Sequence, residues 1–245
     1  MQPLFFLLLF VGAYSQVMIY NCSQLQSLTP NDTSLVYLLA NDVDCSTVPN
    51  FSPVGNCSQN TSFQGLLDGQ NYTVSNLFIN VSQNGVGIIG NAFNATIKNI
   101  RVQNGSVYAY GPANAQISGI GILLGNGAST IVTNCHLEAN GSSANYVGTN
   151  GKIVGGLIGA LSGTGSLISN CTAASTLLDG DPLYSNSVGG LIGSVQGGAL
   201  MTDCHNFGFH GNSSSVVARG SNAVGGVVGF IWSASVSKSG ITLGT

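Results

Sequence analysis

A short apolar block closed by glycine recurs five times along this chain of 245 residues, and this repeat constrains the fold more than any other feature. One copy reads Gly189-Gly190-Leu191-Ile192-Gly193. The closing glycines are Gly90, Gly125, Gly159, Gly193 and Gly229, at spacings of 34 to 36 residues. Self-similarity at a nearly constant period indicates a stack of equivalent units, so the sequence predicts a solenoid.

A second block keeps step with the first, and its composition separates strands from helices. It occupies residues 96–100, 131–135, 167–171 and 200–204, with a degenerate copy at 236–240. Helical repeats of this length use Ala, Leu, Glu and Lys, whereas these blocks are short, β-branched and punctuated by Gly and Asn. We therefore predict an all-β, right-handed parallel β-helix of about five rungs, each with three short strands. The third strand is irregular, as at Thr176-Leu177-Leu178.

The closing glycines have a predicted place in each rung. A coil corner reverses the chain within two or three residues, and glycine reaches a positive φ without a Cβ clash. We expect Gly90, Gly125, Gly159, Gly193 and Gly229 to be corner glycines aligned along one edge of the solenoid.

Charge is scarce, which excludes one class of partner. Only 5% of the residues are charged, five Lys and Arg against eight Asp and Glu, where about 25% is usual. Neutralising several phosphates takes a cluster of basic residues, so we predict no nucleic-acid binding.

The first residues form an apolar run, 4–13, that is too short to span a bilayer. Small residues follow it at Ala13 and Ser15, so 1–15 is predicted to be a signal peptide and the mature protein to begin at Gln16. A buried N-terminal strand is the alternative. Residues 16–62 are expected to form an N-terminal cap segment and 63–245 the repeats, with no transmembrane segment and a secreted, extracellular location.

Acceptor sequences for N-glycosylation agree with export. The candidates are Asn21, Asn31, Asn50, Asn56, Asn60, Asn71, Asn80, Asn94, Asn104, Asn140 and Asn212. A twelfth, Asn170, precedes Cys171 in a predicted strand region and is the most doubtful acceptor. Inert asparagines in turns are the alternative for some of these sites.

The Gly-Leu-Ile-Gly blocks followed by Ile-Ser-Asn-Cys resemble GLUG-motif repeats, and residues 36–45, 51–55 and 63–77 resemble the segment that opens such arrays. The resemblance covers roughly residues 18–240. It implies a parallel β-helix of surface and adhesin-like proteins, also found in some immunoglobulin-cleaving metallopeptidases. The first full repeat has Ile100 in place of Cys, and the last, from Val224, lacks Asn-Cys. We expect either a longer protein or end-to-end self-association through an open C-terminal rung.

Six cysteines in an exported chain predict disulfide bonding. Cys45 and Cys57 flank one loop and are the predicted pair, while Cys22 is an alternative partner for either. Cys135, Cys171 and Cys204 hold the same repeat position, so they should form a cysteine ladder with Cα atoms about 4.8 Å apart. In-register stacking directs their Cβ atoms in parallel, which favours buried free thiols over a bridge.

Catalytic, cofactor-binding and metal-binding residues are not predicted. His136 and His205 fall two rungs apart, too far to share a metal, and His210 has no evident partner. The pairs Asp42/Asp44 and Asp179/Asp181 have a spacing that places both carboxylates on one strand face, suited to Ca²⁺ or acid-base chemistry. Turn chemistry is the simpler interpretation of Asp179/Asp181, whereas Asp42/Asp44 belong to the segment that resembles the opening of a GLUG-motif array.

These observations predict a secreted, N-glycosylated structural or adhesive β-helix at the cell surface, presenting loops 139–152, 178–187 and 207–223. Glycans or surface proteins are the expected partners. The alternatives are a β-helix polysaccharide lyase or hydrolase, and the spacer region of a larger surface peptidase.

Overall fold

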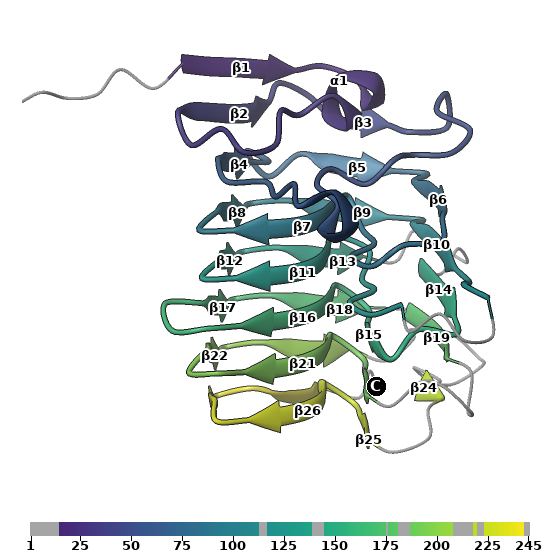
Figure 1. Cartoon of the computed structure of the whole chain (residues 1–245), viewed down its shortest axis with the longest axis vertical. Helices are drawn as coiled ribbons and strands as arrows, with labels where there is room; N and C mark the ends of the chain where they lie inside the picture. The colour runs from purple at the N-terminus through teal and green to yellow at the C-terminus, as the bar shows by residue number, and fades with distance from the viewer. Residues whose placement is uncertain are drawn as a thin grey trace, which may run out of the picture.

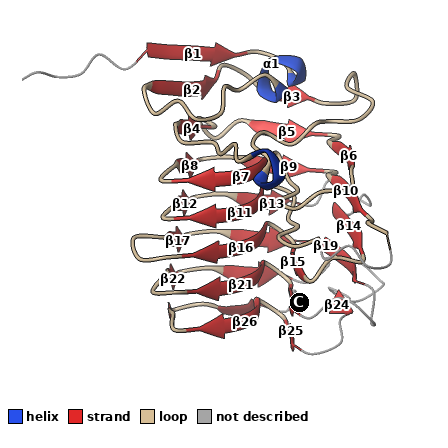
Figure 2. Cartoon of the chain, in the orientation of Figure 1, coloured by secondary structure: helices blue, strands red, loops and turns tan. Residues whose placement is uncertain are grey.

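The chain forms a parallel β-solenoid whose coils stack one below another from β1 to β26 (Figure 1). The computed structural model describes residues 15–112, 117–138, 145–174, 176–180, 187–207, 218–219 and 223–242. Helix is nearly absent from these residues: Figure 2 shows α1 (Cys22–Gln26) and the 3₁₀ turn η1 (Cys57–Gln59) beside the strands. The predicted all-β parallel solenoid is confirmed.

The described strands assemble into five parallel sheets, here numbered 1 to 5. Sheet 1 contains β1 (Ser15–Ile19), β2 (Leu35–Leu39), β4 (Leu66–Asp68), β8 (Thr96–Lys98), β12 (Ile131–Thr133), β17 (Leu167–Ser169), β22 (Leu200–Thr202) and β27 (Ser235–Ser237). Sheet 2 contains β3 (Val43–Asp44), β5 (Thr73–Ser75), β9 (Arg101–Gln103), β13 (His136–Glu138), β18 (Thr172–Ala174), β23 (His205–Phe207) and β28 (Gly240–Thr242).

The other three sheets complete each coil. Sheet 3 contains β7 (Ile89–Phe93), β11 (Leu124–Ala128), β16 (Ile158–Ser162), β21 (Ile192–Gln196) and β26 (Val228–Trp232). Sheet 4 contains β6 (Phe78–Asn80), β10 (Ser106–Ala109), β14 (Asn145–Thr149), β19 (Thr176–Gly180) and β24 (Ala218–Arg219). Sheet 5 contains β15 (Ile153–Gly155), β20 (Ser187–Gly189) and β25 (Ala223–Gly225).

A complete coil therefore has more strands than the predicted three. The coil from β15 to β19 visits sheets 5, 3, 1, 2 and 4 in turn. The extra strand of sheet 5 is hidden in the sequence because it runs directly into the glycine-closed block and ends at the first glycine of that block, as β20 does at Gly189.

Alternation along each strand builds one continuous core. In sheet 1, Ile97, Val132, Ile168 and Met201 pair in register, and each is at most 1% exposed. Each coil covers the inner side chains of its neighbours, and burial contributes about 25 cal/mol for each Å² of apolar area. The outward residues of these strands include polar side chains, such as Thr133 and Ser169, and exposed apolar ones, such as Ile131 and Leu200.

The closing glycines are aligned in sheet 3, but they do not lie at corners. Each is the second residue of its strand, and none has a positive φ. A Cβ on Gly193 would lie 2.6 Å from the carbonyl oxygen of Gly159, and one on Gly159 would lie 2.6 Å from that of Gly125. The corner assignment is therefore wrong: close approach of backbone between coils, rather than left-handed conformation, requires glycine here.

The last described coil leaves apolar side chains uncovered. Ile231 is 48% exposed, whereas Val195, its register partner in the preceding coil, is fully buried. Val236, aligned with buried Met201, is also exposed. Within the described ranges, no helix has the length and apolarity needed to cross a membrane.

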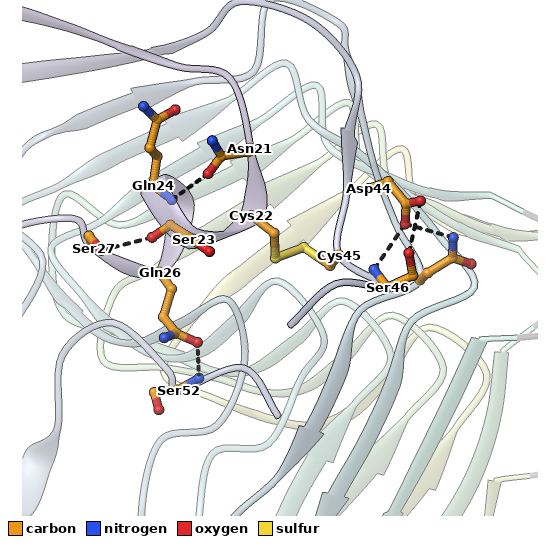
Figure 3. Close-up of a disulfide and its surroundings, with 11 residues drawn as sticks. Asn21, Cys22, Ser23, Gln24, Gln26, Ser27, Asp44, Cys45, Ser46 and Ser52 are labelled. Atoms are coloured by element: carbon orange, nitrogen blue, oxygen red, sulfur yellow. Dashed lines mark hydrogen bonds between the residues drawn. A yellow bond between two sulfur atoms is a disulfide. The ribbon is translucent and has the colours of Figure 1, made fainter. Parts of the chain in front are cut away.

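A disulfide joins the first two coils, and it differs from the predicted one. Cys22 opens α1 and Cys45 follows β3, and the two form a bridge with Cα atoms 5.0 Å apart (Figure 3). The predicted Cys45–Cys57 pair is wrong, because Cys57 is free and exposed in η1, and the alternative that pairs Cys22 with Cys45 is confirmed. The Sγ of Cys57 lies 3.6 Å from the side-chain nitrogen of Asn126 in β11 of sheet 3. Nearness in sequence was misleading because the coil carries residues 45 and 57 to different faces.

Candidate functional site

A row of aromatic side chains covers the outer face of sheet 4 and is the candidate functional site. Strand alternation places it there, because Ile79, Val107 and Val147 point into the core and are fully buried. Their neighbours point outward. We call the following residues the aromatic row: Phe78, Tyr108, Tyr110 and Tyr146.

The rings of the aromatic row are in contact from coil to coil. The centroids of Phe78 and Tyr108 lie 5.6 Å apart, and those of Tyr108 and Tyr146 lie 5.1 Å apart, both in tilted arrangements. Such pairs stabilise each other by about 1 kcal/mol beyond their burial. Phe78 is 37% exposed and Tyr110 is 48% exposed, so the row is a solvent-facing surface as well as a packed one.

A glycine makes room for the hydroxyl end of the row. A Cβ on Gly148 would lie 2.6 Å from the Tyr146 hydroxyl oxygen and 2.9 Å from that of Tyr110. The Tyr146 hydroxyl donates to Oδ2 of Asp179 over 3.4 Å. Burial, and next the neighbouring Tyr110 and Asp179, raise the pKa of Tyr146 to about 12. Tyr146 is thus a neutral hydrogen-bond donor at physiological pH.

This arrangement suits binding by stacking and hydroxyl hydrogen bonds. The sequence did not reveal the aromatic row, because its members do not follow the period of 34 to 36 residues. Phe78 and Tyr108 are 30 residues apart, and Tyr108 and Tyr146 are 38 residues apart. Alternation around Val107 in Ser106-Val107-Tyr108-Ala109-Tyr110 was the available signal.

The loops predicted to present the binding surface contain strands of sheet 4. β14 lies within 139–152, and β24 lies within 207–223. β19 begins two residues before the predicted loop 178–187 and overlaps its first residues. Asn145 of β14 is fully buried, and its Oδ1 accepts from the backbone N–H of Gly105. The remaining parts of these predicted loops, at 139–144, 181–186, 208–217 and 220–222, lie outside the described residues.

An amide ladder stabilises the turns between sheets 1 and 2. The Nδ2 of Asn99 donates to Asp68, that of Asn134 to Asn99 and that of Asn170 to Asn134, over 2.8 to 3.0 Å. The three asparagines have φ of 49 to 56°, the left-handed conformation that Asn tolerates best after Gly. A parallel set, Asp44, Asn76 and Asn104, lies between sheets 2 and 4.

These contacts divide the candidate glycosylation sites. The side-chain nitrogen of Asn50, Asn56, Asn104 and Asn170 donates a hydrogen bond within the protein. Six other candidates are exposed, and their side-chain nitrogen donates no hydrogen bond among the described contacts. They are Asn21, Asn31, Asn60, Asn71, Asn80 and Asn94. Asn140 and Asn212 lie outside the described residues.

The cysteine ladder is a column of buried thiols. Cys135, Cys171 and Cys204 are free and fully buried in successive coils. Each Sγ lies 3.2 to 3.4 Å from the carbonyl oxygen two residues earlier. Burial raises the pKa of the Cys171 thiol well above its ordinary value, so this column is chemically inert.

The described candidate carboxylates accept hydrogen bonds from backbone and side-chain groups of the protein itself. Asp42 and Asp44 share the outer face of β3 as their spacing predicts, with the Asp42 carboxylate accepting from the N–H of Thr73. Asp44 accepts from Ser46 and Asn76, and these bonds hold its pKa below the usual value. Asp179 binds Tyr146, and Asp181 lies outside the described residues.

The histidines do not converge. His136 and His205 each pair with Thr172, one coil to either side, and His210 lies outside the described residues. Burial lowers the pKa of His136, whose ring nitrogens lie 2.9 Å from Thr172 Oγ1 and 3.1 Å from Asn134 Oδ1. No cluster of metal-ligating side chains occurs in the ranges that the structure describes.

Comparison with known proteins gives one likeness. No family model matches the sequence, and no curated protein matches it. Among solved structures, the chain is similar to a putative immunoglobulin A1 protease from Bacteroides ovatus, with 16% identity and a TM-score of 0.46. The match covers 86% of this chain and 84% of that chain.

Proposed function

We propose that this chain is a secreted, N-glycosylated cell-surface module of the GLUG-repeat type, and that it binds partners through the aromatic row. The observation that carries the proposal is four outward aromatic side chains on one sheet face, two of them more than a third exposed. Tyrosine and phenylalanine supply large contact areas at low entropic cost, which is why they are enriched at binding surfaces.

The solenoid supports this role by holding the row rigid. Strands β6, β10 and β14 align Phe78 and Tyr146 with Ser106, so Tyr108, two residues further along β10, lies diagonally between their rings, and the buried inner residues of the same strands fix their backbone. A preorganised surface binds with less ordering of side chains. The scarcity of charge favours partners recognised by stacking and hydrogen bonds, such as neutral glycans or uncharged patches of surface proteins.

Binding of the purified, secreted protein to a neutral-glycan array and to cell monolayers tests the proposal. The Phe78→Ser/Tyr108→Ser double variant should lose at least tenfold in affinity, because stacking contacts of about 1 kcal/mol or more are lost at each position. Tyr72→Ser is the matched control, since Tyr72 is exposed to the same degree as Phe78 but lies outside the row. Equal binding by the double variant and the control would contradict this role.

We also propose end-to-end self-association through the last described coil. Ile231, Trp232 and Val236 are 48%, 66% and 37% exposed, although Ile231 and Val236 continue buried columns of the core. Light scattering after size-exclusion chromatography should show concentration-dependent oligomers that Ile231→Asp abolishes. Identical oligomer distributions for both proteins would rule out this contact.

A further inference from the structure

A shallow groove of about 450 Å³ lies beside the first strand of sheet 3, away from the aromatic row. We call it the Asn60 groove. Its lining consists of Asn31, Asn60, Ser62, Gln64, Asn91, Ala92, Phe93 and Ala128. None of these residues is charged, and five carry an amide or a hydroxyl. The volume is within the range of small-ligand sites.

The wall of the groove is held by hydrogen bonds between segments distant in sequence. The Nδ2 of Asn91 donates to Ser62 Oγ over 2.6 Å, and the backbone N–H of Ser62 donates to Asn31 Oδ1 over 2.9 Å. The side-chain nitrogen of Gln64 also donates to Asn31 Oδ1. These contacts join the segment after η1 to β7 and fix the polar side of the groove.

An exposed aromatic ring also lines the groove. Phe93 ends β7 and is 51% exposed, and its register partner in β11 is the small residue Ala128. A ligand that meets this lining must be uncharged, with an apolar face for Phe93 and polar edges for the amides. A pyranose ring has both, with C–H groups on its faces and hydroxyl or acetamido groups around its edge.

We propose that the Asn60 groove holds the proximal sugars of the N-glycan carried by Asn60 itself. Asn60 begins an acceptor sequence, Asn60-Thr61-Ser62, and caps η1 with φ of 54°. Its side chain is exposed, lines the groove and makes no hydrogen bond among the described contacts. Asn31 is the other acceptor in the lining, but its Oδ1 is held by Ser62 and Gln64. This inference rests on the proposed export and glycosylation.

Thermal unfolding of two preparations tests the inference: protein secreted by a glycosylating host, and the same chain from a host that adds no glycan. Phe93→Ser should lower Tm by about 3 °C in the glycosylated protein, since about 1 kcal/mol of stacking shifts Tm by that amount at this size. In the unglycosylated protein the same change should shift Tm by less than about 1 °C. Asn60→Gln should abolish the effect of Phe93→Ser in the glycosylated protein, whereas Asn80→Gln should preserve it.

Other results would overturn the inference. An equal Tm shift for Phe93→Ser in both preparations would assign Phe93 to protein packing alone. Loss of the effect on Asn31→Gln, with Asn60→Gln unaffected, would assign the groove to another glycan. Glycopeptide mass spectrometry showing Asn60 unmodified while Asn80 or Asn94 is occupied would reject this inference and leave the proposed function standing. An absence of glycan at every site would reject both.

A soluble ligand distinguishes the chain's own glycan from that of another molecule. The probe is tested on Phe78→Ser/Tyr108→Ser protein, so that the aromatic row does not contribute. N,N′-diacetylchitobiose should bind the unglycosylated form weakly, bind it less after Phe93→Ser, and fail to bind the glycosylated form. Tyr72→Ser serves as the aromatic control and should leave this binding unchanged, because Tyr72 is exposed but lies outside both the aromatic row and the groove. Equal binding to glycosylated and unglycosylated protein would show an unoccupied groove, against the inference.

Discussion

The side-chain nitrogen of Asn134 donates to Oδ1 of Asn99 in the preceding coil, over 2.8 Å. The same nitrogen also reaches Asn71 Oδ1, and Asn134 Oδ1 accepts from Asn170. One side chain thus links its own turn to the turns of three other coils. Because amides both donate and accept, the ladder can continue from coil to coil without charge, which suits a sequence with so few ionised residues.

Asn134→Gly should destabilise the protein by about 2 kcal/mol, because hydrogen bonds of roughly 1 kcal/mol each are lost while the left-handed backbone remains accessible. Chemical denaturation measures this change. Asn134→Ala should cost about 1 kcal/mol more, since alanine also opposes the φ of 54°. A stability of Asn134→Gly equal to that of the parent would show that the ladder contributes nothing.

Gly193→Ala should cost about 3 kcal/mol or more, because its Cβ would meet the Gly159 carbonyl oxygen at 2.6 Å and shift the backbone of two coils. Gly165→Ala is the comparison. Gly165 has φ of 85° and open space where a Cβ would lie, so conformation alone should cost about 1 kcal/mol. The reverse order of the two unfolding free energies would restore the corner explanation for Gly193.

Removing the Cys22–Cys45 bridge with serine at both positions should lower stability by about 3 kcal/mol, as expected for a loop closed over 23 residues. Cys57→Ser should leave the midpoint of unfolding unchanged, because Cys57 is exposed and free. A large loss of stability in Cys57→Ser alone would indicate that Cys57 takes part in the bridge.

Alkylation of the native protein should modify Cys57 rapidly and Cys135, Cys171 and Cys204 only after unfolding. The three ladder thiols are fully buried, and burial raises the pKa of Cys171, which leaves little reactive thiolate. Mass spectrometry of chymotryptic peptides reports each position, because aromatic residues and leucines lie between all the cysteines concerned. Labelling of Cys171 at the rate of Cys57 would be incompatible with the packed column.

Acid should weaken the protein partly through Asp68. Burial alone would raise its pKa, but hydrogen bonds from Asn99, Gln70 and Lys98 outweigh burial and hold the pKa below 3.8. A depressed folded-state pKa stabilises the protein above the unfolded value of 3.8, and this contribution is lost as pH falls through the folded-state pKa. Asp68→Asn should therefore flatten the fall in stability below pH 3.8, measured by urea denaturation across pH.

The sequence predicted the repeated architecture because every coil needs the same residue types at equivalent positions, and these residues recur at a regular spacing. The inner residues and the strand glycines recur since each packs against its own equivalent, as Gly159 does against Gly125. The aromatic row and the Asn60 groove follow no period. They depend on how loops of unequal length bring Phe78 beside Tyr108, or Asn60 beside Phe93, which only the folded register fixes.

The disulfide and the residues at the turns were also mispredicted, because both depend on the folded path of the chain. Cys22 and Cys45 meet because one coil of chain returns residue 45 to a place next to residue 22, a relationship that sequence distance hides. The turns between sheets 1 and 2 use asparagine at positive φ, so the conformational demand predicted for glycine is met by Asn99, Asn134 and Asn170 instead.

Parallel pairing with near-constant register makes the single coil an exchangeable unit. Tandem duplication of about 35 codons, inserted between β16 and its equivalent β21, would add one layer of about 4.8 Å and satisfy every backbone group on both sides. Rods of graded length are therefore accessible to evolution in whole steps, and each step would extend the outward face of sheet 4 by one strand.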